Sequence, residues 1–335
     1  MTDIPIIGLV IQFIGFLIDQ LPAISSAAVA VSIPITLAAL CGVISERSGV
    51  VNIGLEGIML TAAFVAWVTG AVAVAMLPPE LKVRIDLFGL SLPLLLALAS
   101  AVLAGMILAA VHAWLSISVK ADQIISGVII NIAALGLTGY LHTIISTQSP
   151  PGAGGFKELN VPDYLIDLPL VGWLIRAIFE QGPIALTAIA LVILTQVLLF
   201  RTRWGLRTRS VGEHPRAAET VGINVIRLRY RNVILSGALA ALGGAYLSIE
   251  LTSSFQAGMT QGRGFIGLAA MIVGRWTPLG AFGAALLFAS TTGVSRAINF
   301  AAPDNDVGRF LESIPQQFYD ALPYLVTIII LAGVI

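Results

Sequence analysis

The chain has 335 residues, of which 57% are hydrophobic and only 11% are charged. Soluble domains usually carry about 25% charged residues, so this composition excludes a soluble globular protein and predicts a membrane protein. The formal net charge is zero, so global electrostatics say nothing about partners. No polar stretch is long enough to link two domains, and we therefore expect a single membrane domain over residues 1–335.

The apolar segments have lengths that suit membrane-spanning helices. A helix needs about 20 mostly apolar residues to cross a hydrocarbon layer roughly 30 Å thick, and it satisfies its own backbone hydrogen bonds there. We therefore predict an all-α, polytopic transmembrane bundle of about 9–10 helices, with broken or re-entrant segments. In chain order, the candidate segments are residues 4–18, 24–44, 57–77, 92–114, 124–145, 183–200, 232–249, 265–274, 279–298 and 314–335.

Basic residues cluster in the loop between the sixth and seventh segments. Residues 201–231 contain eight arginines, and short loops rich in Lys and Arg stay on the cytosolic side of a membrane. We therefore expect this loop to be cytosolic, and alternating crossings place Arg47, Lys120 and Arg275 on the same side. Because the last segment ends at Ile335 without a polar flank, we also expect the natural protein to continue beyond it.

Three polar stretches interrupt the apolar pattern, and the first covers residues 45–57. It holds three glycines between two strong segments, and irregular backbone at membrane depth is tolerated only against protein or a water-filled cavity. We predict a re-entrant segment or one that lines the mouth of a path. The alternative is a cytosolic turn with Glu46 and Arg47 as a solvated pair. Asn52 and Glu56 would share one helix face and are candidates for lining a cavity or for capping a helix.

The second stretch covers residues 120–127 and is followed by Asn131 inside an apolar segment. Asp122 and Gln123 are typical of a helix start, where polar side chains satisfy free N–H groups, and Gln123 is also a candidate for lining the path. Asn131 lies about two turns into the helix, where an amide must find a partner. Its role is either interhelical hydrogen bonding or contact with a substrate.

The third stretch covers residues 252–278, where a short apolar run follows Gln256 and Gln261. Ten residues at 1.5 Å each give about 15 Å, half a bilayer, which predicts a broken or half-length helix. Transporters use such helices to place polar backbone near a substrate path. The alternative is one complete helix that begins earlier and buries both glutamines. Before this stretch, small residues spaced by four predict close packing of another helix: Ser236, Ala240, Gly244 and Ser248.

Motifs for enzymatic chemistry are absent from the sequence. None of the three lysines follows a glycine, which excludes a phosphate-binding loop and places any ATP hydrolysis on another subunit. His112, His142 and His214 lack the spacing of a metal site, and His112 and His142 are expected to be interfacial or packing residues. A basic loop between two spans is a topology signal or a protein contact far more often than a nucleic-acid site. We therefore expect a transport subunit that is not an enzyme and has no metal site.

Four motifs resemble those of ABC importer permeases. Residues 211–224 (VGEHPRAAETVGIN) are similar to the coupling-loop signature of these permeases. Residues 46–57 (ERSGVVNIGLEG), 121–127 (ADQIISG) and 262–270 (GRGFIGLAA) resemble the group that imports branched-chain amino acids and ribose, and within it the purine-nucleoside (guanosine-type) branch. The resemblance extends from about Ala23 to the end of the chain.

The resemblance implies the permease subunit of an ATP-driven ABC importer for nucleosides in the bacterial inner membrane. A permease for a simple sugar such as ribose is the alternative, and a secondary ion-coupled transporter is less favoured because the spans offer few buried carboxylates. The implied partners are a cytosolic ABC ATPase that holds ATP and Mg, a second homologous permease in a heterodimer, an external substrate-binding lipoprotein, and membrane lipid. No cofactor is expected in this chain and no nucleic acid among its partners.

The same resemblance assigns two groups of site residues. A short helix in the loop 201–231 would dock into the ATPase, and the residues that would couple the two proteins are Glu213, Pro215, Arg216, Ala217, Ala218, Glu219 and Gly222. Amides suit a neutral, hydrogen-bonding nucleoside better than charges do. The candidates for the substrate path are Asn52, Glu56, Gln123 and Asn131.

Overall fold

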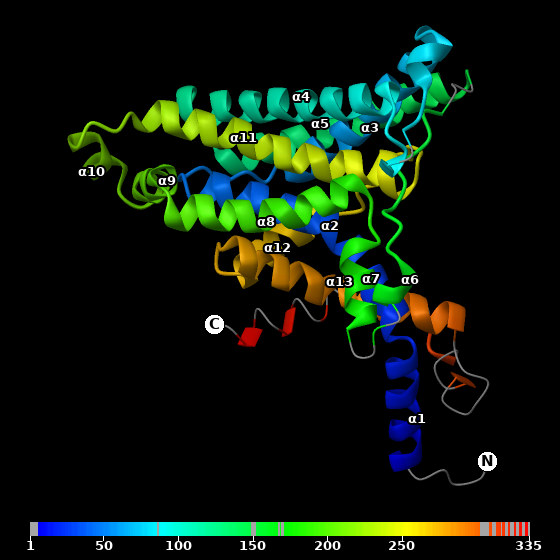
Figure 1. Cartoon of the computed structure of the whole chain (residues 1–335). Coiled ribbons are helices and arrows are strands. Elements are labelled where there is room, and N and C mark those ends of the chain that lie inside the picture. Colours follow the sequence, from blue (N-terminus) through cyan, green and yellow to red (C-terminus); the bar gives the residue numbers. More distant parts are fainter. Residues whose placement is uncertain are drawn as a thin grey trace. The chain divides into compact units, whose positions relative to one another are not determined.

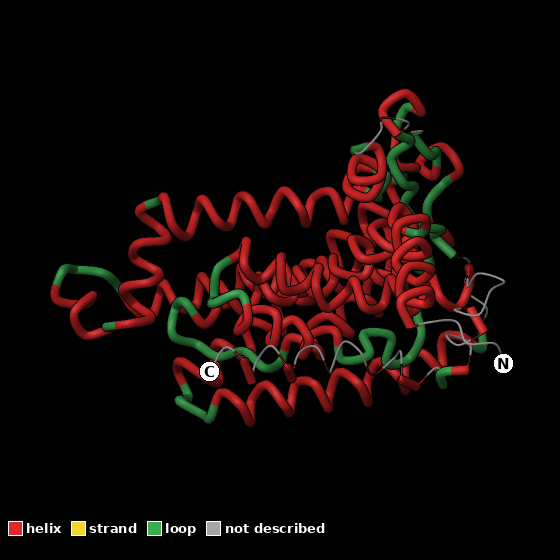
Figure 2. The backbone as a smooth tube through the Cα atoms, turned by 90° about the horizontal axis from the view of Figure 1, so that it is seen from below, coloured by secondary structure: helices red, strands yellow, loops and turns green. Residues whose placement is uncertain are grey.

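The computed structural model describes residues 6–85, 87–148, 152–166, 168 and 171–301, together with scattered positions between 308 and 333. These residues form helices and loops without a strand, as Figures 1 and 2 show, so the all-α prediction is confirmed. The helices are α1 (Ile6–Asp19), α2 (Leu21–Glu46), α3 (Leu55–Met76), η1 (Pro79–Lys82), η2 (Leu87–Gly89), α4 (Leu92–Ala113), η3 (Trp114–Ser118), α5 (Gln123–Ser146), α6 (Asp163–Ile166), α7 (Gly172–Phe179), α8 (Pro183–Arg201), α9 (Arg203–Glu213), α10 (Pro215–Thr220), α11 (Val225–Ala245), η4 (Tyr246–Leu251), α12 (Arg263–Val273) and α13 (Pro278–Ala301).

Seven helices in the described part of the chain are long and apolar enough to cross a membrane. The protein is therefore a multi-pass membrane protein. Two of the predicted segments form the shorter helices α1 and α12, of 14 and 11 residues, and the predicted segment 314–335 lies largely outside the described residues. The spanning helices are Leu21–Glu46, Leu55–Met76, Leu92–Ser118, Gln123–Ser146, Pro183–Arg201, Val225–Leu251 and Pro278–Ile298.

The chain divides into two compact units, and α2 and α13 contribute residues to both. The first unit comprises Met1–Ser32, Asn160–Gln181 and Leu286–Ile335, and the second comprises Ile33–Leu159 and Gly182–Ala285. The two units are defined by how compactly their residues pack, and a single membrane domain over the whole chain stays a prediction. All candidate site residues belong to the second unit.

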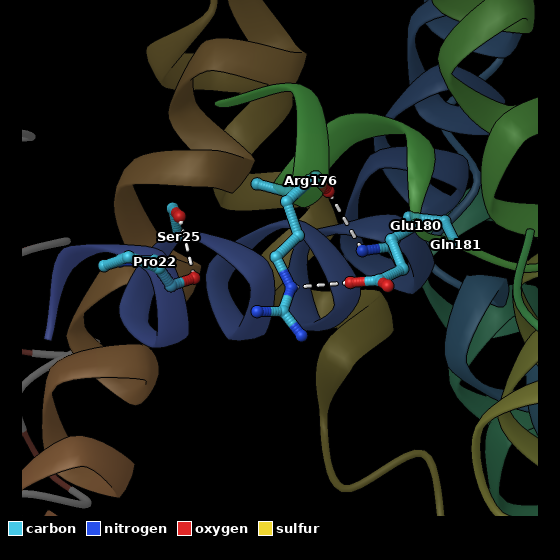
Figure 3. Close-up of polar contacts among 6 residues, drawn as sticks. Pro22, Ser25, Arg176, Glu180 and Gln181 are labelled. Carbon is cyan, nitrogen blue, oxygen red and sulfur yellow. Dashed lines mark hydrogen bonds and ion pairs between the residues drawn. The ribbon is translucent and has the colours of Figure 1, made fainter. Parts of the chain in front are cut away.

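The first unit has a small apolar core in which Phe16 and Ile24 pack with Ala297 and Ile298. On α7, the Arg176 Nε donates to Glu180 Oε2 at 2.6 Å, a surface pair that Figure 3 shows. Such exposed pairs contribute at most about 1 kcal/mol, so apolar packing holds this unit together.

The second unit is built on close contacts of α11 with α3 and α4, which Figure 1 shows running alongside one another. Ser236, Ala240 and Ser248 are buried, and a Cβ on Gly244 would collide with the Met59 carbonyl oxygen of α3. The predicted ladder of small residues therefore does let another helix approach its backbone.

Candidate functional site

The chain between α2 and α3 is irregular and lies against α5. It turns after Glu46 through Gly49, whose φ is +83°, and stays non-helical until Leu55. A Cβ added at Gly127 of α5 would lie 2.7 Å from the Gly54 nitrogen, so the two backbones are in contact. Glycine is required at Gly49 for its positive φ and at Gly127 for this approach. The segment is thus irregular and packs against protein, and its predicted role as a re-entrant segment or one that lines the mouth of a path stays a prediction.

Glu46 and Arg47 do not form the solvated pair considered from the sequence. The Trp276 indole donates to Glu46 Oε2 at 2.6 Å, while Arg47 donates from Nε to the Trp276 carbonyl at 3.1 Å and from Nη2 to the Arg275 carbonyl at 3.3 Å. The Arg47 guanidinium also lies 3.9 Å from Glu213 of α9. Glu46 and Arg47 therefore connect the end of α2 to the turn between α12 and α13, because both side chains bind residues of that turn.

Two of the amides predicted to line the path bind this irregular backbone. Asn131 Oδ1 accepts from the Gly57 N–H at 2.7 Å, and its Nδ2 donates to the Ile53 carbonyl at 3.0 Å. Gln123 Oε1 accepts from the Val51 N–H at 2.7 Å, so its predicted role as a cap of its own helix is wrong. Asn131 has the hydrogen-bonding role that was one of its two alternatives, and substrate contact by either residue stays a prediction.

Asp122 and Asn52 are the neighbouring polar residues. Asp122 Oδ1 accepts from Ile124 N at 2.8 Å and from Ile125 N at 3.1 Å, so its predicted role as the cap of α5 is confirmed. Asn52 is fully buried, and its Oδ1 accepts from the Gly54 N–H at 3.0 Å. No described acceptor lies within reach of its Nδ2, which leaves one buried amide donor of this site without a partner.

His112 belongs to the same region, a placement that no sequence pattern indicated. It is fully buried on α4, with Nε2 2.9 Å from the Val51 carbonyl oxygen and Nδ1 3.0 Å from the Ser126 hydroxyl. Both backbone groups of Val51 are thus bound by side chains. The partner on the irregular backbone is 61 residues away in the sequence, which is why local patterns could not reveal it.

Glu56 binds the N-terminus of the half-length helix α12. Its Oε1 accepts from the Gly262 N–H and its Oε2 from the Gly264 N–H, both at 2.7 Å. A carboxylate is favourable here because the first N–H groups of a helix have no intrahelical acceptor and carry its positive dipole end. The predicted half-length helix is confirmed, and Glu56 caps it from a distant part of the chain.

A second carboxylate does the same for α8 and was missed by sequence reasoning. Glu250, in the π-helical turn η4, accepts from the Ile184 N–H at 2.7 Å and from the Ala185 N–H at 3.0 Å. Nothing in the sequence near either segment indicates this pairing. Glu56 and Glu250 therefore each bind the start of a helix through two backbone N–H groups.

Aromatic rings join α3, α5 and the chain that leads into α12. Phe255 lies 5.2 Å from Phe64, 6.0 Å from Trp67 and 5.1 Å from His142 between ring centroids. His142 was expected to be an interfacial or packing residue, and packing is what these contacts show. Each such ring contact contributes about 0.5–1.5 kcal/mol beyond the burial of its apolar area. The contacts therefore stabilise the packing of the chain that leads into α12.

The loop 201–231 is folded into α9 and α10. The predicted coupling residues Pro215, Arg216, Ala217, Ala218 and Glu219 lie in α10, Glu213 ends α9, and Gly222 follows α10 with a φ of +82°. Figure 1 shows α9 and α10 where α8 ends and α11 begins.

Apolar packing and a side-chain network fix these two helices. Ala218 packs with Val211, Val225 and Leu228 in a buried cluster. The Trp204 indole donates to Asn232 Oδ1 at 3.1 Å, which ties α9 to α11. The loop is therefore a structured element that holds α10 in one orientation.

The profile of the family described as "Branched-chain amino acid transport system / permease component" matches residues 24–331. The chain belongs to this family. Most of the permease is covered by the match, in line with the resemblance expected from about Ala23 onward.

Among its relatives, the permease is 38% identical to the guanosine ABC transporter permease protein NupQ of Bacillus subtilis, over 95% of this chain and 94% of NupQ. It is 37% identical to the nucleoside ABC transporter permease protein NupC of Lactococcus lactis, over 90% of this chain and 88% of NupC. TsgC13 of Haloferax volcanii, whose name assigns it provisionally to glucose, is 34% identical over 92% of this chain and 90% of its own. The permease is therefore a transport subunit of a multi-component ABC system, and not an enzyme.

Proposed function

We propose that the permease imports nucleosides through the cytoplasmic membrane of a bacterium as one subunit of an ATP-driven ABC transporter. The observation that carries this proposal is the similarity to NupQ and NupC, which spans 95% and 90% of the chain. The interior agrees with an uncharged substrate. Glu56 and Glu250 are already bound to backbone N–H groups, and the remaining polar side chains there are mostly amides and hydroxyls.

The proposed partners follow from the same similarity. A cytosolic ATPase binds ATP and Mg and drives transport, a second and homologous permease completes the path, and an external lipoprotein delivers the substrate. We propose no cofactor for this chain itself, and its sequence contains no phosphate-binding loop that would hold ATP.

The ATPase docks on α10 and its flanks in this proposal. Two features support a docking role for Glu213, Pro215–Thr220 and Gly222. The apolar cluster around Ala218 fixes the orientation of α10, and Val221 at its end is 74% exposed, so its apolar side chain is accessible to a partner. An ordered helix costs less entropy to bind than a flexible loop does.

The substrate path passes the junction of α5, α12 and the chain between α2 and α3. Asn52, Glu56, Gln123 and Asn131 gather there around non-helical backbone. Asn52 supports this placement best, because its unpaired Nδ2 is a donor that an incoming nucleoside can satisfy once the path opens.

The test of the substrate uses the complete transporter in proteoliposomes with its lipoprotein. We expect ATP-dependent uptake of labelled guanosine that unlabelled adenosine or guanosine inhibits and that a tenfold excess of ribose or glucose does not. A binding titration of the isolated lipoprotein with guanosine, adenosine and ribose provides a second measurement. Uptake that responds to the sugars alone would contradict the nucleoside assignment.

Sugar import is the second candidate, and the similarity to TsgC13 favours it. The two candidates share the same scaffold and the same proposed partners. The competition experiment separates them, because only the inhibitor that shares the substrate's site reduces uptake.

A further inference from the structure

The chain between α2 and α3 touches the docking loop at its first end. Gly212 of α9 has no room for a Cβ, because the Arg47 carbonyl oxygen lies against it and the Gly49 nitrogen would be 3.3 Å away. From α11, Arg229 donates its Nε to the Ser48 carbonyl at 3.0 Å. The turn at residues 47–49 is therefore held between the end of α9 and the start of α11, the two helices that flank α10.

The other end of the same segment reaches α5 and α12. Gly54 and Ile53 lie against Gly127, where a Cβ would come within 2.7 and 3.0 Å of their backbone atoms. Asn131 binds the backbone on both sides of Gly54. Glu56 then carries the contact to the first N–H groups of α12.

Between these ends, side chains of α4 and α5 also bind the middle of the segment. Gln123 binds the N–H of Val51 and His112 lies at hydrogen-bond distance from its carbonyl oxygen. Gly49 lies in one turn, Ile53 and Gly54 lie in a second, and Leu55 begins α3, so only residues 50–52 lie outside a turn or helix. A segment that is bonded at its start, middle and end moves with its partners and does not absorb their displacement by local rearrangement.

We propose that residues 47–57 transmit movement of the α9–α10 loop to the N-terminus of α12, with Gly212 and Arg229 as positioning residues at one end and Gly127 at the other. The proposal rests on the proposed function, since it takes the ATPase to bind α10. When the ATPases close, α9 displaces the turn at residues 47–49, and the segment shifts Glu56 together with the start of α12. The path thus opens or closes at its broken helix.

The test is a matched pair of glycine variants on α5, each in the complete transporter in proteoliposomes. Gly127→Ala places a methyl group against the segment, whereas Gly136→Ala meets no described atom within 4 Å. The readout is guanosine imported per ATP hydrolysed. We expect the ratio to fall at least about fivefold in Gly127→Ala, the lower range of allosteric coupling, and to stay at the wild-type value in Gly136→Ala. A purely structural role lowers uptake and hydrolysis together and leaves the ratio unchanged, which overturns the proposal.

A second pair tests the other end. Arg229→Met removes the donor to Ser48, and Arg231→Met, an exposed arginine on the same helix, is the control. We expect the ratio to fall in the first variant only. Distant sites without shared partners usually act additively, so additive losses in the double variant Arg229→Met/Gly127→Ala also overturn the proposal.

Different results would contradict the proposed function and the transmission role. If the wild-type complex shows no ATP-driven uptake, the proposed function is wrong. If the wild type imports guanosine and Gly127→Ala keeps its ratio, only the transmission role is wrong. Should Gly127→Ala fail to assemble, the ratio of Arg229→Met decides, and an unchanged value there overturns the proposal.

Discussion

Two carboxylates in the apolar interior of this permease bind the free backbone N–H groups at the starts of helices. Glu56 and Glu250 each accept hydrogen bonds from two N–H groups, at α12 and α8 respectively. In a bilayer these N–H groups have no water to bind, and each unsatisfied group costs several kcal/mol. A charged residue in an apolar segment is therefore stabilised here, because it accepts the hydrogen bonds that water would accept at the start of another helix.

Removal of the Glu56 carboxylate should therefore destabilise the permease. Glu56→Ala leaves the Gly262 and Gly264 N–H groups without their acceptor, and we expect the free energy of unfolding to fall by about 3–6 kcal/mol, because each of the two hydrogen bonds to a charged group contributes roughly 1.5–3 kcal/mol. Glu56→Gln keeps one acceptor oxygen and should lose about half as much. The measurement is unfolding of the purified permease in mixed micelles with increasing SDS. The control is Glu80→Ala, an exposed residue of η1, and equal stability of the Glu56 and Glu80 variants would falsify the capping role.

At the scale of elements, α9 and α10 form a small folded unit that depends on the turn after it. Gly222 has a φ of +82° and its N–H donates to the Glu219 carbonyl at 3.0 Å. Proline can supply neither the positive φ nor the N–H. Asparagine tolerates the left-handed region and keeps the donor.

If α10 couples the permease to the ATPase, proline and asparagine at position 222 should have opposite effects on ATP hydrolysis. Gly222→Pro should insert and assemble normally yet lose substrate-stimulated ATP hydrolysis in the reconstituted complex, because α10 no longer ends in its native orientation. Gly222→Asn should retain most of the stimulation. The measurement is ATP hydrolysis with and without substrate-loaded lipoprotein, and wild-type stimulation in Gly222→Pro would rule out docking through this helix.

Elements were predictable from the sequence to the extent that their causes are local. Apolar length identified the spanning helices and the half-length helix α12, and a carboxylate at a helix start identified the Asp122 cap. The partners of polar side chains were not predictable. Glu56 meets the start of α12 at a separation of 206 residues, and His112 meets Val51 from another helix, so these contacts exist only once the helices have packed.

At the scale of the whole molecule, one face of the second unit carries polar, irregular backbone. The chain that leads from η4 into α12 is non-helical and exposes Gln256, Ala257 and Gln261. It lies beside α5, since a Cβ on Gly258 would be 3.8 Å from Leu135. Lipid-exposed irregular backbone does not occur within the hydrocarbon region. This face must therefore meet water or another protein chain.

The outer face of α4 provides the contrast. Its exposed residues Leu103 and Ile107 are apolar and belong to regular helix, which lipid accommodates without cost. We therefore expect a water-soluble, membrane-impermeant thiol reagent to label Ala257→Cys in the assembled transporter and to leave Leu103→Cys unlabelled. The native Cys41 is fully buried and should contribute no background. The measurement is the labelled fraction of each variant in intact proteoliposomes, with full labelling after denaturation as the reference. Equal labelling of the two variants would mean that the chain leading into α12 does not border a water-filled path, because only aqueous access distinguishes the two positions.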